Sequence, residues 1–255
     1  MIDYFHKSKV KYELATIKRG GYSLDKMRNM IVKDALDLKA DYLLFLDTDM
    51  SFPDFMITRM LKVFEANKNC EAVTGVYTWK KEPYLPQLFG KFDQKKKKFH
   101  ILSGFILNQP FWVVGAGLGA MMVKADLFRR VKEPWFKFVE KGEDKRIPLG
   151  LGEDLYFAWK CKPKMLCDPQ IVCGHYDIRP VGLKNYVEKN GLKVEKNKIL
   201  ITKEQAKEID KKHQNMISGR KNPVNKENKT VKEKTLSKNK TSSSRKLVKN
   251  TRVSN

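Results

Sequence analysis

Residues 42–53, YLLFLDTDMSFP, decide the fold of this chain. Five apolar or aromatic residues run without a break into the acidic pair Asp47 and Asp49. A continuous apolar run of this length is typical of a strand that is buried on both faces of a sheet. Ser51 and Pro53 favour the start of a helix directly afterwards. The segment therefore predicts a buried strand, an acidic turn and a helix, in that order.

Strand and helix patterns alternate on both sides of this segment. Residues 12–17 (YELATI) and 72–77 (AVTGVY) are typical of strands, and residues 23–39 have the apolar spacing of a helix. A hairpin is expected around the basic turn at 94–98, and residues 151–162 (LGEDLYFAWKCK) predict a further helix. This alternation predicts an α/β fold whose sheet is mixed but mostly parallel and is flanked by helices.

Charge and composition divide the chain into regions. The formal net charge is +23 over 255 residues, and nearly half of this excess lies in the last fifth of the sequence. Residues 1–200 predict a globular domain, residues 201–216 a short helix or linker, and residues 217–255 a Lys-rich tail. The tail has too few apolar residues to offset the entropy of ordering it, so we expect it to be disordered. Such a tail either contacts polyanions non-specifically or is simply solvated.

Membrane and export signals are not evident in the sequence. No apolar run reaches the roughly 18 residues that a membrane span needs. The first residues, MIDYFHKSK, lack the apolar core of a signal peptide. The sequence therefore predicts a soluble protein in the cytoplasm.

The acidic pair is placed where chemistry is common in α/β proteins. Ligands bind outside the carboxyl ends of the strands in open α/β sheets, and Asp47 and Asp49 directly follow a predicted strand. Side chains two residues apart on an extended segment point to the same side. Two carboxylates on one side form an oxygen-rich site that suits Mn²⁺ or Mg²⁺. The alternative is an acidic surface turn in which Asp49 caps the next helix.

Four segments together resemble a glycosyltransferase of the GT-A type, near family 2 as found in phages and bacteria. They are residues 21–61, which contain the acidic pair, residues 113–128 (VVGAGLGAMMVKADLF), residues 151–162, and residues 167–177 (CDPQIVCGHYD). They occur in the order expected for that family. The resemblance implies a Rossmann-like nucleotide-diphospho-sugar transferase fold. It also implies a nucleotide-sugar donor and an acceptor hydroxyl on a glycan, lipid or protein.

Roles for several residues follow from the resemblance alone. It implies that Asp47 and Asp49 bind a divalent metal, that Asp47 also contacts the donor diphosphate, and that His175 completes the metal site. Arg28 and Asn29 match the Arg-Asn pair near the donor nucleotide. Simpler interpretations remain open: His175 as a strand-end histidine that is hydrogen-bonded to backbone, and the Arg-Asn pair as part of a solvated helix face.

The resemblance also implies where the chemical step occurs. Asp154 matches the general base of inverting members, and Glu153 matches a contact to the acceptor. Acidic residues in the first turn of a helix are favoured by the helix dipole in any protein, which is the alternative here. Gly115 and Gly117 match positions where backbone approaches the donor. They are equally compatible with tight packing between neighbouring segments.

The start of the chain departs from the family pattern. GT-A domains begin with a strand that holds the nucleotide base, whereas MIDYFHKS resembles the end of the helix that follows it. We therefore expect the first strand to be missing. Two other functions stay open from sequence: a nucleotidyltransferase with the same metal chemistry, and a nucleic-acid-binding protein that acts through the basic tail.

Overall fold

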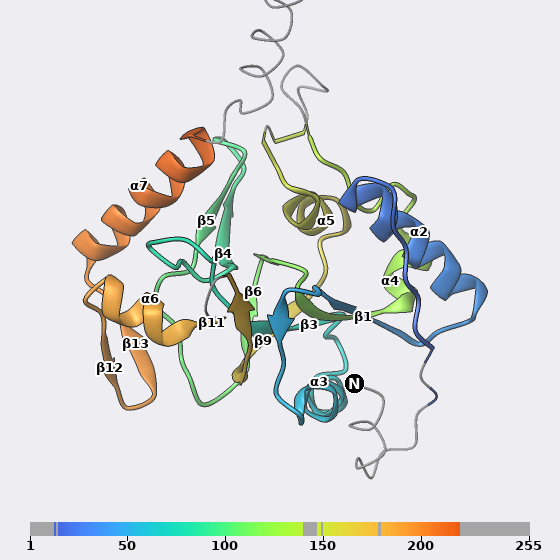
Figure 1. Ribbon diagram of the computed structural model, residues 1–255, viewed down its shortest axis with the longest axis horizontal. Coiled ribbons are helices and arrows are strands. Elements are labelled where there is room, and N and C mark those ends of the chain that lie inside the picture. Colours follow the sequence, from blue (N-terminus) through green and yellow to red (C-terminus); the bar gives the residue numbers. More distant parts are fainter. Residues whose placement is uncertain (1–12, 14, 140–146, 149, 178–179, 220–255) are drawn as a thin grey trace, which may run out of the picture. The chain divides into compact units, whose positions relative to one another are not determined.

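The computed structural model consists of two compact units, residues 1–213 and residues 214–255. The second unit is described only for the six residues 214–219, which end the last helix. The tail expected over 217–255 lies outside the described residues from position 220 onward, and so does the MIDYFHKS segment. The residues that the structure describes are 13, 15–139, 147–148, 150–177 and 180–219 (Figure 1).

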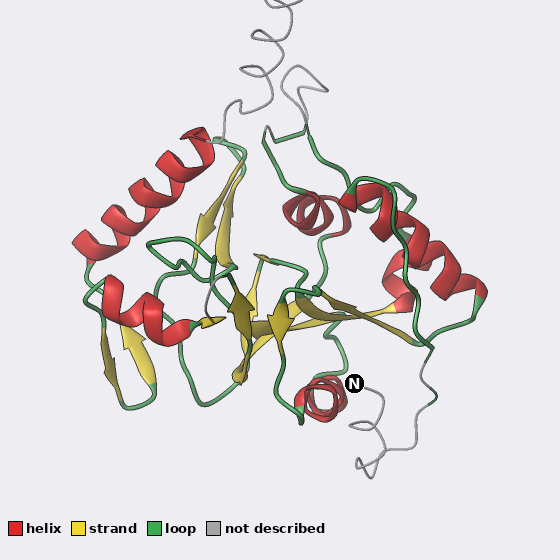
Figure 2. Ribbon diagram, viewed as in Figure 1, coloured by secondary structure: helices red, strands yellow, loops and turns green. Residues whose placement is uncertain are grey.

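A five-stranded sheet forms the centre of the first unit, with the strand order β1-β8-β3-β9-β6 (Figures 1 and 2). Strand β8 is antiparallel to both β1 and β3, strand β6 is antiparallel to β9, and only β3 and β9 pair in parallel. The chain is therefore α/β with a mixed sheet, but the mostly parallel sheet that we expected is wrong. The five strands are β1 (Tyr42–Leu46), β3 (Ala72–Val76), β6 (Phe111–Val113), β8 (Ala120–Lys124) and β9 (Met165–Val172).

The direction of the strands still gathers their carboxyl ends. Because β8 is antiparallel to both of its neighbours, β1 and β3 run in the same direction, and β9 is parallel to β3. The residues that follow these three strands therefore lie at one edge of the sheet. The glycine-rich segment that leads into β8 starts from the same edge. The expected placement of the acidic pair thus survives the change in strand pairing.

Helices cover both faces of this sheet (Figure 2). On one face, α3 (Met56–Ala66) buries Met60 and Phe64 against residues of β3, β8 and β9. On the other face, Phe45 of β1 packs edge-on against Phe128 and Phe136, which also contact Phe157. The helices on this second side are α2 (Leu24–Asp37), α4 (Ala125–Arg130) and α5 (Glu153–Cys161).

Helix α2 confirms the expected helix, although the segment before it differs from expectation. Its buried side chains are Arg28, Val32 and Ala35, so a cation lies on the inward face. Residues 13 and 15–17 form no strand, so the strand expected over 12–17 is wrong for the part that the structure describes. An inward arginine requires a partner carboxylate, because a buried charge is costly without one.

The remaining elements form smaller sheets and the end of the chain. The expected hairpin is confirmed, with its turn at 94–97, and the helix expected over 151–162 is confirmed as α5. No helix among the described residues combines the length and apolar character needed to cross a bilayer. These elements are β2 (Met50–Ser51), β4 (Leu88–Asp93), β5 (Lys98–Ile101), β7 (Gly115–Ala116), β10 (Gly174–Tyr176), β11 (Pro180–Val181), α6 (Leu183–Lys189), β12 (Lys193–Glu195), β13 (Lys198–Leu200) and α7 (Lys203–Gly219).

Candidate functional site

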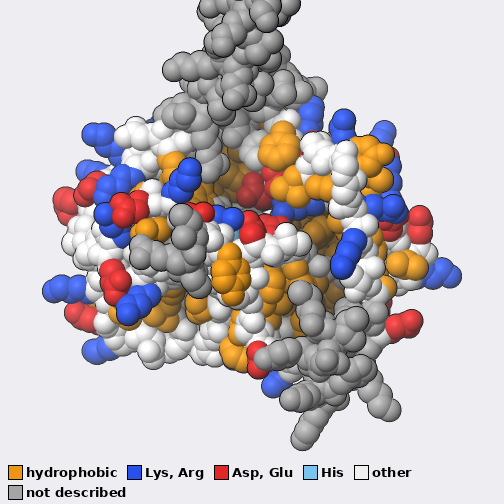
Figure 3. Space-filling model, viewed as in Figure 1, with side chains coloured by type: hydrophobic (Ala, Val, Ile, Leu, Met, Phe, Trp, Pro, Cys, Tyr) orange, Lys and Arg blue, Asp and Glu red, His pale blue; other side chains and the backbone are white. Residues whose placement is uncertain are grey.

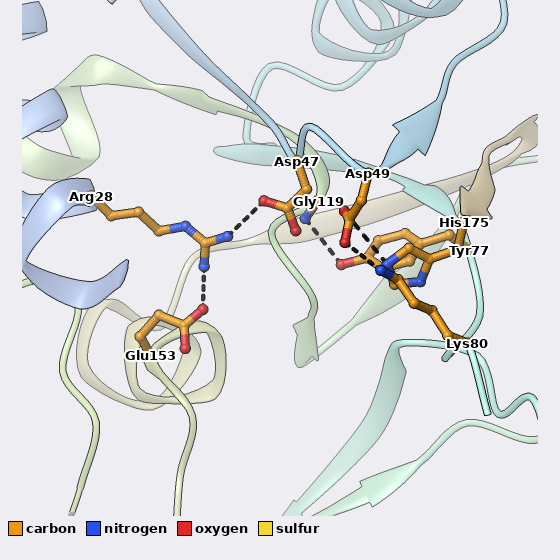
Figure 4. A network of polar contacts seen from close by, with 8 residues as sticks. All are labelled: Arg28, Asp47, Asp49, Tyr77, Lys80, Gly119, Glu153 and His175. Carbon is orange, nitrogen blue, oxygen red and sulfur yellow. Dashed lines mark hydrogen bonds and ion pairs between the residues drawn. The ribbon is translucent and has the colours of Figure 1, made fainter. Parts of the chain in front are cut away.

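The acidic turn after β1 is brought to His175 by a short strand pairing. The turn leads into β2, which is antiparallel to β10, so that His175 lies opposite Met50. The backbone N–H of Tyr176 donates to the carbonyl of Asp49 at 2.8 Å. A Cβ on Gly174 would overlap the hydroxyl of Ser51 where that side chain now lies, so glycine leaves room for the serine between these strands. Residues more than 120 positions apart therefore meet at the edge of the sheet (Figure 4).

The side chain of Asp49 lies between a lysine and a histidine (Figure 4). The ammonium of Lys80 is 2.5 Å from Oδ2, and the Nε2 of His175 is 3.7 Å from Oδ1. The second distance is too long for a hydrogen bond. Burial alone would raise the pKa of Asp49, but the Lys80 hydrogen bond and the charges of His175 and Lys80 lower it below its usual value. Asp49 is therefore a carboxylate at neutral pH.

The orientation of the His175 ring is fixed by the backbone. Its Nδ1 lies 2.8 Å from the carbonyl oxygen of Thr78, and a nitrogen that faces a carbonyl must donate. In the neutral ring Nε2 then carries the lone pair, and it is this atom that faces Asp49. His175 is therefore hydrogen-bonded to backbone and also faces Asp49. A backbone-bonded histidine and a metal ligand are compatible interpretations of this residue.

Asp47 belongs to a different network, on the side of α2 and α5. Arg28 is 4% exposed and donates to Asp47 Oδ1 at 3.0 Å, while its other terminal nitrogen pairs with Glu153 (Figure 4). The solvated helix face considered for Arg28 is therefore wrong. Its guanidinium joins the turn after β1 to the first turn of α5. A contact of Arg28 with the donor remains a prediction.

The two acidic residues that begin α5 have raised pKa values. Burial and the neighbouring charge of Asp154 raise the pKa of Glu153 to about 7, although Arg28 opposes the shift. Burial also raises the pKa of Asp154, against the hydrogen bond from the Leu155 backbone N–H at 2.7 Å and the charge of Arg28. Carboxyl groups of this kind take up a proton near neutral pH more readily than exposed ones do.

Asn29 uses its side-chain amide within the chain. Its Oδ1 accepts the backbone N–H of Trp135 at 2.9 Å, and its Nδ2 donates to the carbonyls of Phe136 and Asp25 at 2.7 and 2.8 Å. These bonds hold the segment after α4 against α2. The predicted role of Asn29 at the donor is not tested by this arrangement.

The glycines before β8 face side chains of the same chain. A Cβ on Gly117 would overlap the hydroxyl of Tyr77, and a Cβ on Gly115 would meet Leu155 and Phe99 at 3.2 Å. The Tyr77 hydroxyl accepts the backbone N–H of Gly119 at 3.0 Å. Burial raises the pKa of Tyr77 well above its usual value, so this hydroxyl stays neutral. The packing explains why these positions are small, and contact with a donor remains a prediction for Gly115 and Gly117.

The three predicted metal ligands do not converge on one point. Within the described ranges, no group of three or more His, Cys, Asp or Glu side chains is arranged to hold a metal ion. Asp49 and His175 face each other, whereas Asp47 is turned toward Arg28. Acidic and basic side chains lie beside one another around a hollow near the middle of the face in Figure 3. The arrangement offers two protein ligands, with Asp47 as a neighbour.

Sequence reasoning missed two residues of the site. Tyr77 is the last residue of the AVTGVY segment, and Lys80 lies three residues after it. The signal that could have found them is strand direction. Residues after β3 lie at the same edge as residues after β1, because the two strands run in the same direction. A lysine three residues after the predicted strand was therefore a candidate for contact with the acidic pair.

Comparisons with known proteins give little guidance about this site. No protein-family model and no curated protein matches the chain. Among solved structures, the crystal structure of A197 from STIV is similar, with a TM-score of 0.49 and 22% sequence identity over 72% of this chain and 83% of that chain. The function therefore has to be argued from the residues of the site.

Proposed function

We propose that this protein is a metal-dependent glycosyltransferase with a GT-A type of arrangement, which moves a sugar from a nucleotide-sugar donor to an acceptor hydroxyl. The observation that carries the proposal is the pair formed by Asp49 and His175. Its two side chains face each other, with Nε2 3.7 Å from Oδ1, at the edge where β1, β3 and β9 end. The four segments that resemble glycosyltransferases contribute to this edge or to the adjoining first turn of α5.

Asp49 and His175 offer two ligands of the kinds that a divalent cation takes. A carboxylate and a neutral imidazole nitrogen are both ligands for Mn²⁺, and Mg²⁺ is commonly held by one or two carboxylates together with substrate phosphates. His175 also donates Nδ1–H to the Thr78 carbonyl, which is the usual outer contact of a metal-bound histidine. When bound, the cation would hold the diphosphate of the donor and offset the charge on the departing nucleoside diphosphate.

The two acidic residues in the first turn of α5, which adjoin Arg28, supply the proton transfer. The acceptor oxygen forms a bond to the anomeric carbon of the sugar as the bond from that carbon to the phosphate oxygen breaks. Asp154 takes the proton of the acceptor hydroxyl, and its raised pKa makes it a stronger base than an exposed carboxylate is. Glu153 contacts the acceptor, and Arg28 positions Glu153 against Asp47. The acidic pair at the start of this late helix favours sugar transfer over the nucleotidyltransferase alternative, in which the acceptor attacks phosphorus.

Ligand-dependent thermal stability tests the proposal. The melting temperature is measured with UDP-, GDP-, CDP- and TDP-sugars, each with and without Mn²⁺. We expect a rise only with Mn²⁺ and one nucleotide class, since a ligand that binds the folded state stabilises it by about 2.7 kcal/mol at one hundred times its Kd. The variant Asp49→Asn should lose this rise.

Asp41→Asn is the matched control, because Asp41 is exposed and precedes the same strand at its opposite end. The melting temperature of this control should rise with Mn²⁺ and the nucleotide sugar as much as that of the unchanged protein does. The proposal fails if no nucleotide sugar raises the melting temperature in the presence of Mn²⁺, or if Asp49→Asn keeps the full response.

A further inference from the structure

Lys80 lies on a loop that is held in place at both its base and its tip. At the base, the backbone N–H of Trp79 donates to Leu85 and that of Gln87 donates to Tyr77, at 2.9 and 3.0 Å. At the tip, the side chain of Asn190 donates to the carbonyl of Pro83 at 2.9 Å. The backbone of Lys80 is therefore anchored, whereas its side chain is 31% exposed and ends on Asp49.

The ammonium of Lys80 and a bound metal would be neighbours on one carboxylate. Lys80 is 2.5 Å from Oδ2 of Asp49, and the other oxygen, Oδ1, is the one that faces His175. Two cations that share one carboxylate repel each other. Lysine is a compact charge on a flexible stem, so it can leave the carboxylate for another anion close by.

We propose that Lys80 is the protein's own cation at this site: it competes with the divalent metal for Asp49, and it turns to the diphosphate of the donor once the metal is bound. This inference rests on the proposed function, because it takes Asp49 as a metal ligand and a diphosphate as the substrate group. Lys80 thus keeps Asp49 paired in the absence of ligand and adds a charge-assisted hydrogen bond to the phosphate in its presence.

The first test measures Mn²⁺ binding alone, by titration calorimetry with the full chain. Lys80→Gln should bind Mn²⁺ more tightly, by roughly two- to fivefold, which is the range that partly exposed ion pairs of up to about 1 kcal/mol allow. Lys80→Arg retains the charge, so its affinity for Mn²⁺ should be close to that of the unchanged protein. Lys81→Gln removes an exposed neighbouring lysine and is the matched control.

The second test uses the preformed complex of Mn²⁺ with inorganic pyrophosphate as the probe. Lys80→Gln should bind this complex about tenfold more weakly, since hydrogen bonds to charged groups contribute roughly 1.5–3 kcal/mol. The two effects of one substitution therefore have opposite signs. A merely structural role for Lys80 would weaken both kinds of binding together, and that result would overturn the inference, as would no change in either.

Asp49→Asn separates this inference from the proposed function. If Asp49→Asn binds Mn²⁺ as well as the unchanged protein does, the metal site itself is wrong and both proposals fall. If Asp49→Asn loses Mn²⁺ while Lys80→Gln leaves the affinity for Mn²⁺ and for the pyrophosphate complex unaltered, only the role of Lys80 is wrong.

Discussion

Two aspartates that are two residues apart have different partners. Asp47, whose side chain is 37% exposed, is paired with a buried arginine that also binds the buried Glu153, so its network continues to the first turn of α5. Asp49 is 47% exposed on its side chain and has a flexible lysine and a histidine as neighbours. The first network includes a cation that is 4% exposed, whereas the second is open to ligands.

This difference indicates a division of labour within one acidic motif. Removing one partner of a buried ion pair is strongly destabilising, because the remaining charge has lost its compensation. Exposed pairs contribute little to stability and exchange partners readily. We therefore infer that Asp47 and Arg28 fix the geometry of the site, and that Asp49 is the carboxylate available to bind a ligand. The predictions below test whether the two sides differ in this way.

The largest effect is expected for Arg28→Met at pH 8. This substitution keeps an apolar stem but removes the guanidinium group, so it leaves the buried Glu153 without a cation. The free energy of unfolding should fall by about 3–5 kcal/mol, which is the usual range for a broken buried pair. Urea denaturation monitored by circular dichroism measures this change.

A second variant separates charge from packing at Arg28. Adding Glu153→Gln to Arg28→Met removes the uncompensated acid and should recover part of the lost stability. A loss below about 1 kcal/mol for Arg28→Met alone, the range of exposed pairs, would mean that the closed network is no stronger than the open one.

An intermediate effect is expected in the pH dependence of stability. The pKa of Glu153 is raised to about 7 from its ordinary value of 4.5, so the folded chain keeps a proton that the unfolded chain releases. The free energy of unfolding should therefore fall as the pH rises from about 4.5 to about 7. One such group contributes a slope of up to roughly 1.4 kcal/mol per pH unit.

Glu153→Gln isolates this contribution from that of the other carboxyl groups. The difference in the free energy of unfolding between the unchanged protein and the variant should change steadily from about pH 4.5 to about pH 7 and level off at higher pH. A difference that is constant from pH 4 to pH 8 would contradict the raised pKa. It would indicate that Glu153 has the same pKa in the folded chain as in the unfolded chain.

The location of the candidate site was predictable from local sequence, because it depends on short-range rules. The apolar run before Asp47 predicts a buried strand, and the ends of strands in α/β sheets are where ligands bind. Helix α5 was likewise recognisable from its acidic first turn and apolar spacing. These features need no knowledge of the partner strands.

The strand pairing and the partners of each acidic residue were not predictable in the same way. Nothing in residues 120–124 shows that they insert antiparallel between β1 and β3, since a buried strand has the same composition in either direction. The helical pattern of α2 likewise predicts that Arg28 lies on a helix, but not that its side chain is buried. Its burial depends on the carboxylates of Asp47 and Glu153, which come from other elements. Long-range pairs of this kind are fixed by tertiary packing.

The smallest effect on stability is expected on the open side, for Asp49→Asn. Both partners of the pair with Lys80 are well exposed, at 31% and 47%, so its loss should lower the free energy of unfolding by less than about 1 kcal/mol. A double-mutant cycle with Lys80→Gln, measured by urea denaturation at low and high salt, isolates the coupling between the two side chains. The coupling should be small and should weaken with added salt, because exposed charges are screened. A coupling above about 3 kcal/mol that resists salt would make this pair a structural element like that of Arg28, and Asp49 would not be free to bind a metal.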